Sequence, residues 1–456
     1  MKNLYFMRVF AAFVLLVHVG CTTSVDKKLE EATQLYAEKK YNKALALIDP
    51  ILQKAPDSLP AQKLKALSHI EQGALPAALD GYEQVEKTHP EIAYSLLKEI
   101  SLAIIKKSLT DENFFVRSAA VKAVGETGDS ALIPLITASM RDKAMFVRFF
   151  AVEAFGQLGG PDALKLIMAA KKDPEGMVRV AAVKVLADLE KEERAGFALS
   201  NLLAIFTDDA DITVRLFALA AMSKEGDEKS LTKLIKEVKV LEGGARASGV
   251  AALGRSQNPA SIPLLKEYLS DADKSIRMYA AEAIGNVPSV EFYEDLLRIL
   301  NDEDTAVRGA AATSLGKLGD PRAIPALEKK MDDPNAMVRI SVAEGLKWLG
   351  EGKMEIYRKA LTDPDYGVRH FAIGSLRRKW GKKGIPVLTR FLKDEAPRVR
   401  IAAIRALGEV GDVKELPLIK QRLQDHDNAV RTYAAGNVIR IINKSEGMKF
   451  KKSAGK

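Results

Sequence analysis

The sequence contains a single cysteine, Cys21, in 456 residues, which excludes an internal disulfide and any site built from several thiolates. Aromatic residues amount to only 6%, whereas Ala, Leu and Val recur throughout, and this mixture favours closely packed helices over a sheet-rich core. There is no glycine-rich phosphate-binding loop and no nucleophile elbow centred on a serine. The five histidines lack the spacing of metal ligands: His18, His69, His89, His370 and His426. The sequence therefore predicts an all-α protein that is not an enzyme and has no metal or cofactor.

The positive charge is concentrated at the two ends of the chain. The formal net charge is +9, of which +2 lies in residues 1–20 and +4 in residues 444–456. About +3 is left for the chain between them, which predicts a mildly basic, solvated surface and gives no indication of nucleic-acid binding. Residues 444–456 are predicted to form a basic, disordered tail.

A short apolar run at residues 9–17 follows Lys2 and Arg8. The run is too short to span a bilayer, but it has the length and the basic start of an export signal. Gly20 stands directly before Cys21, and a small residue before the only cysteine resembles the lipobox of bacterial lipoproteins. The resemblance implies that a signal peptide, 1–20, is removed and that the Cys21 thiol then carries diacylglycerol.

The lipobox resemblance also implies a location. Residues 21–27 would form a lipid-anchored tether to the bacterial cell envelope, and Thr22, in place of Asp, favours the outer membrane, on its periplasmic side or surface, if the host has two membranes. His18 departs from the pattern, which usually has Leu at this position. An ordinary cleaved secretory signal and an uncleaved anchor stay open as alternatives.

Two segments between residues 29 and 90 repeat at a period of 34. Ala44 matches Ala78 and Pro56 matches Pro90 in the two copies. The first copy, "LYAEKKYNKALALIDPILQKAPD", resembles a tetratricopeptide repeat, in which two antiparallel helices cross at small residues. The second copy is looser. We therefore expect two tetratricopeptide-like repeats over 28–91.

From about residue 92 the period changes to 31. The marker of each unit is an Arg that follows an apolar residue, usually Val, at Arg117, Arg148, Arg179, Arg215, Arg246, Arg277, Arg308, Arg339, Arg369, Arg400 and Arg431. An Asp stands six positions earlier in ten of the eleven units: Asp111, Asp142, Asp173, Asp209, Asp271, Asp302, Asp333, Asp363, Asp394 and Asp425. Val240 replaces it before Arg246. The step to Arg215 is 36 residues and indicates a short insertion near 189–200. We number the repeats 1 to 11 by these arginines.

Each unit predicts two helices. The first often opens with Pro, and an N-cap residue four positions before the marker Arg opens the second: Asn113, Asp273, Asp304, Asn335 and Asp427. Numbered from the Arg, positions −1, +3, +4 and +7 of the second helix are apolar and form one buried stripe. Positions +6 and +8 are small, so that neighbouring helices can approach, and a Gly at +8 often closes the helix.

These units resemble the short HEAT-like repeats first named from phycobilin lyases, and the resemblance covers roughly 92–443. It implies a right-handed α-solenoid (an α-α superhelix) of about eleven HEAT-like repeats after the two tetratricopeptide-like ones. HEAT-like hydroxylases bind iron through His-Glu pairs, which this sequence lacks. Most members are scaffolds for other macromolecules.

The resemblance also implies a role for the recurring Asp and Arg. In HEAT-like arrays they form a hydrogen-bonded ladder along the stack, and the fork of an Arg can bind a carboxylate and turn carbonyls together. We expect this structural ladder to contain every marker Arg except Arg246, together with the ten aspartates. A binding residue would be expected in a few units rather than in all of them.

Positions +2, +5 and +9 lie opposite the buried stripe, and family geometry makes them the concave lining. Aromatic residues and cations recur there: Phe150, Phe217, Tyr279, Trp348, Phe371, Tyr433, Arg255, Lys317, Arg378, Arg405 and Arg440. Such a row suits an extended peptide or a partner helix. The alternative is that the rings only pack against adjacent repeats. Trp380 lies two residues beyond this row and is interpreted as a local packing residue.

The sequence thus predicts a non-catalytic envelope lipoprotein that presents an elongated concave surface to a protein partner, with no nucleic-acid or small-molecule ligand. The alternative is a binder of anionic cell-wall or lipid polymer through the basic groove residues and the tail. Salt separates the two, because polyanion binding weakens steeply as ionic strength rises.

Overall fold

A computed structural model describes residues 24–189, 198–287 and 290–447. Every regular element in these ranges is helical. The chain divides into two compact units, residues 1–103 and 104–456, and the boundary falls within α6. We describe each unit separately.

Unit 1 consists of antiparallel helix pairs. Its helices are α2 (Ser24–Ala37), α3 (Tyr41–Lys54), α4 (Leu59–Glu71), α5 (Leu75–Thr88) and the first part of α6 (Pro90–Ser108). Ala44 and Ala78 are both fully buried, as the repeat pattern predicts for the small residues at which paired helices cross. Helix α2 begins at Ser24, so the expected tether of residues 21–27 ends in helix.

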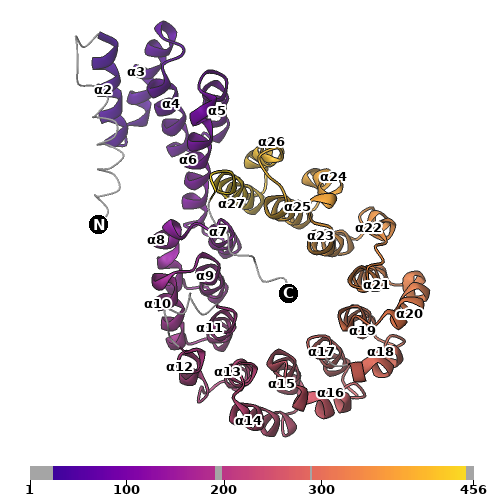
Figure 1. Cartoon of the computed structure of the whole chain (residues 1–456). Coiled ribbons are helices and arrows are strands. Elements are labelled where there is room, and N and C mark those ends of the chain that lie inside the picture. Colours follow the sequence, from indigo (N-terminus) through magenta and orange to yellow (C-terminus); the bar gives the residue numbers. More distant parts are fainter. Residues whose placement is uncertain (1–23, 190–197, 288–289, 448–456) are drawn as a thin grey trace. The chain divides into compact units, whose positions relative to one another are not determined.

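Unit 2 alternates long inner helices with short outer segments, and Figure 1 shows the two layers. The inner helices are α7 (Phe114–Glu126), α9 (Met145–Leu158), α11 (Gly176–Asp188), α13 (Ile212–Lys224), α15 (Gly243–Ser256), α17 (Lys274–Ile284), α19 (Thr305–Leu318), α21 (Ala336–Trp348), α23 (Tyr366–Trp380), α25 (Pro397–Val410) and α27 (Asn428–Ser445). Each contains one marker Arg in its first turns. The described part of unit 2 is therefore an array of eleven helical repeats.

The outer segments are shorter and often include a 3₁₀ turn. They are η1 (Ser130–Leu132), α8 (Ile133–Ile136), η2 (Thr137–Arg141), α10 (Pro161–Ala169), η3 (Ala170–Lys172), α12 (Leu199–Leu203), η4 (Ala204–Phe206), α14 (Glu228–Lys239), η5 (Pro259–Ser261), α16 (Ile262–Tyr268), η6 (Val290–Phe292), α18 (Tyr293–Ile299), η7 (Pro321–Ala323), α20 (Ile324–Lys329), η8 (Lys330–Asp332), α22 (Met354–Ala360), η9 (Gly381–Gly384), α24 (Ile385–Leu388), η10 (Thr389–Lys393), α26 (Leu416–Lys420) and η11 (Gln421–Gln424). The insertion predicted near 189–200 falls mainly on residues 190–197, outside the described residues.

The local signals in the sequence explain where the inner helices begin. All five predicted N-caps accept hydrogen bonds from the first turn: Asn113, Asp273, Asp304, Asn335 and Asp427. The predicted stripe is the core, since Val307, Ala311, Ala312 and Leu315 of repeat 7 are all fully buried. These predictions are confirmed.

The glycines at position +8 serve helix packing more than helix termination. A Cβ on Gly125 would lie 2.8 Å from the Cβ of Ala154, and one on Gly254 would lie 2.5 Å from the Cβ of Ala283. In both cases position +8 of one repeat meets position +6 of the next. Only a residue without a side chain permits inner helices to cross this closely.

The array of unit 2 closes on itself. Helix α27 packs against α7 as the inner helices of successive repeats do, and Figure 1 shows the two side by side. Ser108 and Thr432 join across this seam by a hydrogen bond of 2.7 Å between their hydroxyl oxygens. Arg405, in repeat 10, donates to Glu126, in repeat 1, at 2.7 Å. The expected elongated surface is therefore a closed ring in unit 2.

The seam is displaced by about one helical turn from the regular register. In regular pairs position +8 packs on position +6 of the next repeat, but at the seam Gly436, at +5, packs on Ala123, at +6. A Cβ on Gly436 would lie 2.8 Å from the Cβ of Ala123. Three residues of α-helix correspond to about 4.5 Å of axial rise. The ring therefore closes with a small step at the seam.

The last helix of unit 2 continues beyond the boundary that the sequence predicts. Helix α27 extends to Ser445, and the Lys444 ammonium donates to the Gly408 carbonyl at 2.9 Å. The boundary predicted for a disordered tail, 444, is therefore too early, because Lys444 caps carbonyls of the preceding repeat. Cys21 and the last nine residues lie outside the described residues. In the described ranges no helix has the length and apolar character required to cross a bilayer.

Candidate functional site

Arg308 shows how a marker arginine connects two repeats. Its Nε and Nη2 donate to the two carboxylate oxygens of Asp333 at 2.9 and 3.1 Å. Its Nη1 donates to the carbonyls of Asp302 and Glu303 at 2.9 and 3.0 Å. The fork thus binds its own turn through carbonyls and the next repeat through a carboxylate, a geometry that Lys cannot reproduce.

The marker Arg binds the aspartate of the next repeat in seven pairs of unit 2, through Nε and Nη2 in six of them and through Nη2 alone at Arg400. The pairs are Arg117–Asp142, Arg148–Asp173, Arg179–Asp209, Arg277–Asp302, Arg308–Asp333, Arg369–Asp394 and Arg400–Asp425. Arg246, which the sequence analysis left out of the ladder, also reaches Asp271 at 3.2 Å. Burial would raise the pKa of Asp333, but the hydrogen bonds from Arg308 and a backbone amide outweigh it and hold that pKa below its ordinary value.

The ladder has two interruptions within the array. Repeat 5 offers Val240 where Arg215 would find an aspartate, and the Arg215 Nε instead lies 3.8 Å from Glu237. Arg339 donates to the carbonyls of Asp333 and Pro334. The Asp363 carboxylate, which the pattern would pair with Arg339, accepts from the amide of Asp365.

At the seam the ladder continues through a different residue. Arg431 donates to the side-chain oxygen of Asn428, and Asn428 donates to the Asp111 carboxylate at 3.3 Å. Asn428 stands three residues before Arg431, which is the same displacement that Gly436 shows. The amide therefore relays the ladder from repeat 11 to repeat 1 across the step.

Most inner rings at position +2 carry a cation from the repeat before them. The Lys122 ammonium lies 4.3 Å from the centroid of Phe150, Lys184 lies 4.4 Å from Phe217, and the Arg405 guanidinium lies 5.6 Å from Tyr433. Each cation comes from position +5. Phe217 and Tyr433 are each only 7% exposed, and burial lowers the pKa of Lys122 and of Lys184. One face of each of these rings therefore already contacts a cation of the same chain.

The predicted groove cations also have partners in the chain. Arg255 donates to Asp188 at 3.2 Å, Lys317 to Asn286 at 3.1 Å, Arg378 to Glu344 at 2.9 Å and Arg405 to Glu126 at 2.7 Å. Arg255 and Asp188 lie two repeats apart, a reach that is possible only where the helices converge on the inner side. Arg440 is buried, and burial lowers its pKa.

The inner face is more open around repeats 8 and 9. Trp348, at position +9, is 47% exposed, and the Lys379 ammonium lies 3.2 Å from its ring centroid. Burial lowers the pKa of Lys379 to about 8. Tyr279 and Phe371 are half-buried. Trp380 packs edge-on against Tyr357 at 6.2 Å, consistent with a packing role.

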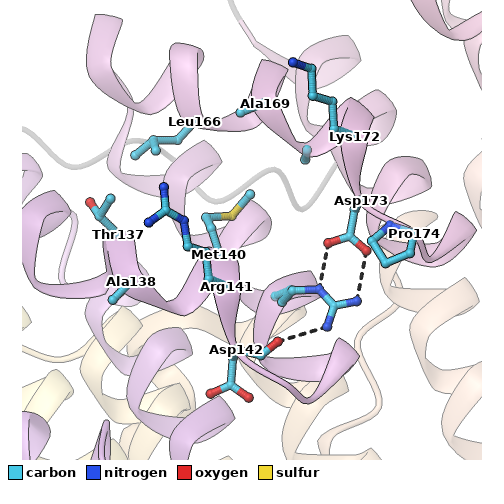
Figure 2. Close-up of a pocket in the computed structure, with 12 residues that line it drawn as sticks. Thr137, Ala138, Met140, Arg141, Asp142, Leu166, Ala169, Lys172, Asp173 and Pro174 are labelled. Atoms are coloured by element: carbon cyan, nitrogen blue, oxygen red, sulfur yellow. Dashed lines mark hydrogen bonds and ion pairs between the residues drawn. The ribbon is translucent and has the colours of Figure 1, made fainter.

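Sequence reasoning missed a second surface, at position −2. Phe115, Phe146 and Met177 occupy it in repeats 1 to 3 and are 65%, 43% and 52% exposed. The signal was present, since an apolar residue stands there in three successive repeats, but the apolar neighbour at −1 masks it. A cavity of about 930 Å³ lies between the outer segments of repeats 2 and 3 (Figure 2). In the described ranges no three His, Cys, Asp or Glu side chains are placed to hold a metal ion.

Comparisons with known structures give likenesses of low identity. The complex of CpcE and CpcF of phycocyanin lyase from Nostoc sp. PCC7120 is 18% identical, with a TM-score of 0.36, over 53% of this chain and 94% of that one. Human deoxyhypusine hydroxylase in complex with glycerol is 19% identical, with a TM-score of 0.28, over 57% of this chain and 99% of that one. Kap121p bound to Pho4p is 14% identical, with a TM-score of 0.32, over 88% of this chain and 52% of that one.

No curated protein matches the sequence. The family model of HEAT repeats matches residues 102–187, 242–303, 293–353 and 354–440, which together make up more than half of the chain. The matched residues include every marker arginine except Arg215. This chain belongs to the HEAT-repeat family.

Proposed function

We propose that this chain is a non-catalytic scaffold that holds a protein partner against the inner face of unit 2. HEAT-repeat solenoids are typically scaffolds for protein–protein interaction. The observation that supports the proposal most is Trp348, a large ring on the inner row that is 47% exposed. An exposed, positioned aromatic residue provides binding area at a small cost in side-chain entropy.

The proposed contact area is the sector of repeats 6 to 9 rather than the whole row. Tyr279 and Phe371 are half-buried there, whereas Phe217 and Tyr433, in repeats 4 and 11, are almost fully covered. Lys379 over Trp348 adds a cation at the edge of the sector. A partner segment with apolar and acidic side chains fits this combination.

The polyanion alternative has weaker support. Arg255, Lys317, Arg378 and Arg405 each bind an acceptor in the chain, so a polymer of phosphates or carboxylates would have to displace these contacts.

The proposal includes attachment to the bacterial cell envelope through a lipid on Cys21, at the outer membrane where the host has two. The support is the sequence around Cys21, since this residue lies outside the described ranges. Metabolic labelling with an alkyne fatty acid tests it. We expect label on the wild-type chain and none on Cys21→Ser, and an unlabelled wild-type chain would contradict the anchor.

In-cell cross-linking tests the scaffold. A Trp348→Ala/Phe371→Ala variant should lose a protein that the wild type captures, while its helicity and melting stay unchanged. The matched control is Met337→Ser, an exposed apolar residue of the same helix α21 at its other end. Equal capture by wild type and variant at both low and physiological salt would contradict the assignment to the inner face.

A further inference from the structure

A second exposed apolar surface lies on the edge of unit 2, where the outer segments lead into the inner helices. Phe115, Phe146 and Met177, which we name the rim ridge, each follow the first residue of an inner helix. Equivalent positions of successive repeats lie side by side in a solenoid. The other repeats place Thr213, Gly244, Ser275, Ala306, Met337, Gly367, Arg398 and Ala429 at this position. The ridge is therefore specific to repeats 1 to 3.

The rings of the ridge form one continuous apolar surface. Phe114 packs on Phe115 with 4.0 Å between ring centroids and stacks on Phe146 at 6.3 Å. The cations that cover rings elsewhere in the described residues do not cover these. A run of exposed apolar side chains with no intramolecular cover is typical of a binding surface.

Basic residues outnumber acidic ones in the segments that lead into the ridge. Six exposed basic residues lie in the outer ends and turns of repeats 1 to 3, against two exposed carboxylates, Glu112 and Glu175. The six are Lys106, Lys107, Arg141, Lys143, Lys171 and Lys172. The ladder carboxylates of these turns, Asp142 and Asp173, are already bound by arginines. The edge of repeats 1 to 3 thus favours an acidic ligand.

The cavity between repeats 2 and 3 opens within this same edge. Its walls include Met140, Leu166 and Ala169, and Arg141 and Lys172 also line it (Figure 2). The turns that line it, at Asp142 and Asp173, lead directly into Phe146 and Met177. The cavity can hold an apolar side chain whose neighbours are carboxylates.

The spacing of the repeats selects the form of the ligand. Adjacent inner helices are about 8–10 Å apart, and a chain in the polyproline II conformation has three residues per turn and rises about 3.1 Å per residue. Every third residue of such a chain lies on the same side and therefore meets a new repeat. We propose that the rim ridge, its basic turns and the adjoining cavity bind an extended acidic segment of a partner protein, with apolar side chains at every third position. This surface is separate from the inner face and does not depend on it.

An anionic membrane surface also attracts apolar residues flanked by lysines. The cavity favours the peptide, because its walls match a side chain and a planar bilayer cannot enter it. Glu112 and Glu175, placed among the cations, also favour a peptide over a uniformly anionic surface.

The test uses the purified full chain and a fluorescein-labelled nonapeptide, (Asp-Leu-Glu)₃, followed by fluorescence anisotropy. The control peptide has the same composition with its three Leu residues adjacent. We expect saturable binding of the first peptide and binding at least about tenfold weaker for the control. Failure of the wild-type chain to bind the first peptide, or equal binding of both, overturns the proposal.

Variants then locate the site. Phe115→Ser/Phe146→Ser/Met177→Ser should weaken binding at least about tenfold, as should Lys143→Glu/Lys172→Glu. Met337→Ser, the same position in repeat 8, should bind as the wild type does. If the triple variant does not fold, the single variant Phe115→Ser, at the most exposed ring, replaces it. Co-sedimentation with phosphatidylglycerol vesicles provides the other arm, and ridge-dependent binding to vesicles without binding of the peptide would overturn the proposal in favour of a membrane.

Discussion

The inner row and the rim ridge lie on the same helices, yet their side chains have different surroundings. At position +2, Phe150 and Phe217 receive a cation from position +5 of the preceding repeat, and Phe217 is buried while Phe150 is half-buried. At position −2, Phe115 and Phe146 have no such cover and are exposed. The difference shows that the exposure of a ring on these helices depends on which side chains the neighbouring repeat supplies.

The largest loss of stability is expected from breaking a buried ion pair of the ladder. Arg400 and Asp425 are both buried, and the Arg400 Nη2 donates to Asp425 at 2.7 Å. Arg400→Met should lower the free energy of unfolding by about 3–5 kcal/mol, because it leaves the buried Asp425 carboxylate without its cation and two turn carbonyls without a donor. Urea unfolding followed by circular dichroism measures it. Arg398→Ala, an exposed neighbour, is the control, and equal midpoints for the two variants would contradict the structural role.

Truncating a ring of the inner row should destabilise the chain nearly as much, whereas truncating a ring of the rim ridge should not. Phe217→Ala should lower the free energy of unfolding by about 3 kcal/mol, because it opens a cavity beneath Lys184. Phe115→Ala should change it by no more than about 0.5 kcal/mol, because that ring is exposed. Comparable losses for the two variants would remove the distinction between covered and uncovered rows.

A larger side chain at position +5 should destabilise the chain more at the seam than in a regular repeat. Gly436→Val should cost about 1–3 kcal/mol and increase the radius of gyration in small-angle X-ray scattering, because its Cβ meets Ala123. Gly374→Val, at the same position of repeat 9, is the matched control, since the nearest atom to its Cβ is a flexible Arg378 nitrogen at 3.6 Å.

A disulfide provides a direct check on closure. In a Cys21→Ser background, Ser108→Cys/Thr432→Cys should form an intramolecular disulfide under mild oxidation, because the two hydroxyl oxygens are 2.7 Å apart. A chain whose ends stay apart would give only free thiols or dimers.

The smallest effect is expected on the stability of the chain at acidic pH. Hydrogen bonds from Arg117 lower the pKa of Asp142, and for Asp302 burial, which raises the pKa, is outweighed by the hydrogen bonds from Arg277. The stability from these carboxylates is present above about pH 3.8, their unfolded value, and is lost as the pH falls through the lower folded pKa. Melting temperatures between about pH 2 and pH 6 should fall on acidification less for Asp302→Asn than for wild type. Phe115→Ser should keep the wild-type profile.

The repeated elements were predictable because their causes are local. The N-caps such as Asn113 and Asp304, and the buried stripe around Val307, follow from short-range spacing and hydrophobic period. The rings of the inner row were predictable as a row, but their degree of cover was not. Whether Phe217 is covered depends on Lys184, which stands 33 residues earlier. The rim ridge went unrecognised because Phe115 and Phe146 adjoin core valines in sequence.

The sequence by itself determined the helical repeat, the ladder pattern and the family, since each is encoded within one period. Only the tertiary structure decided that unit 2 closes, because closure depends on the small rotation between repeats summed over eleven of them. It also decided that the seam is displaced by a turn, so that Gly436 packs on Ala123 and Asn428 reaches Asp111. No single repeat contains that information, because the rotation is set by how each inner helix packs on the next.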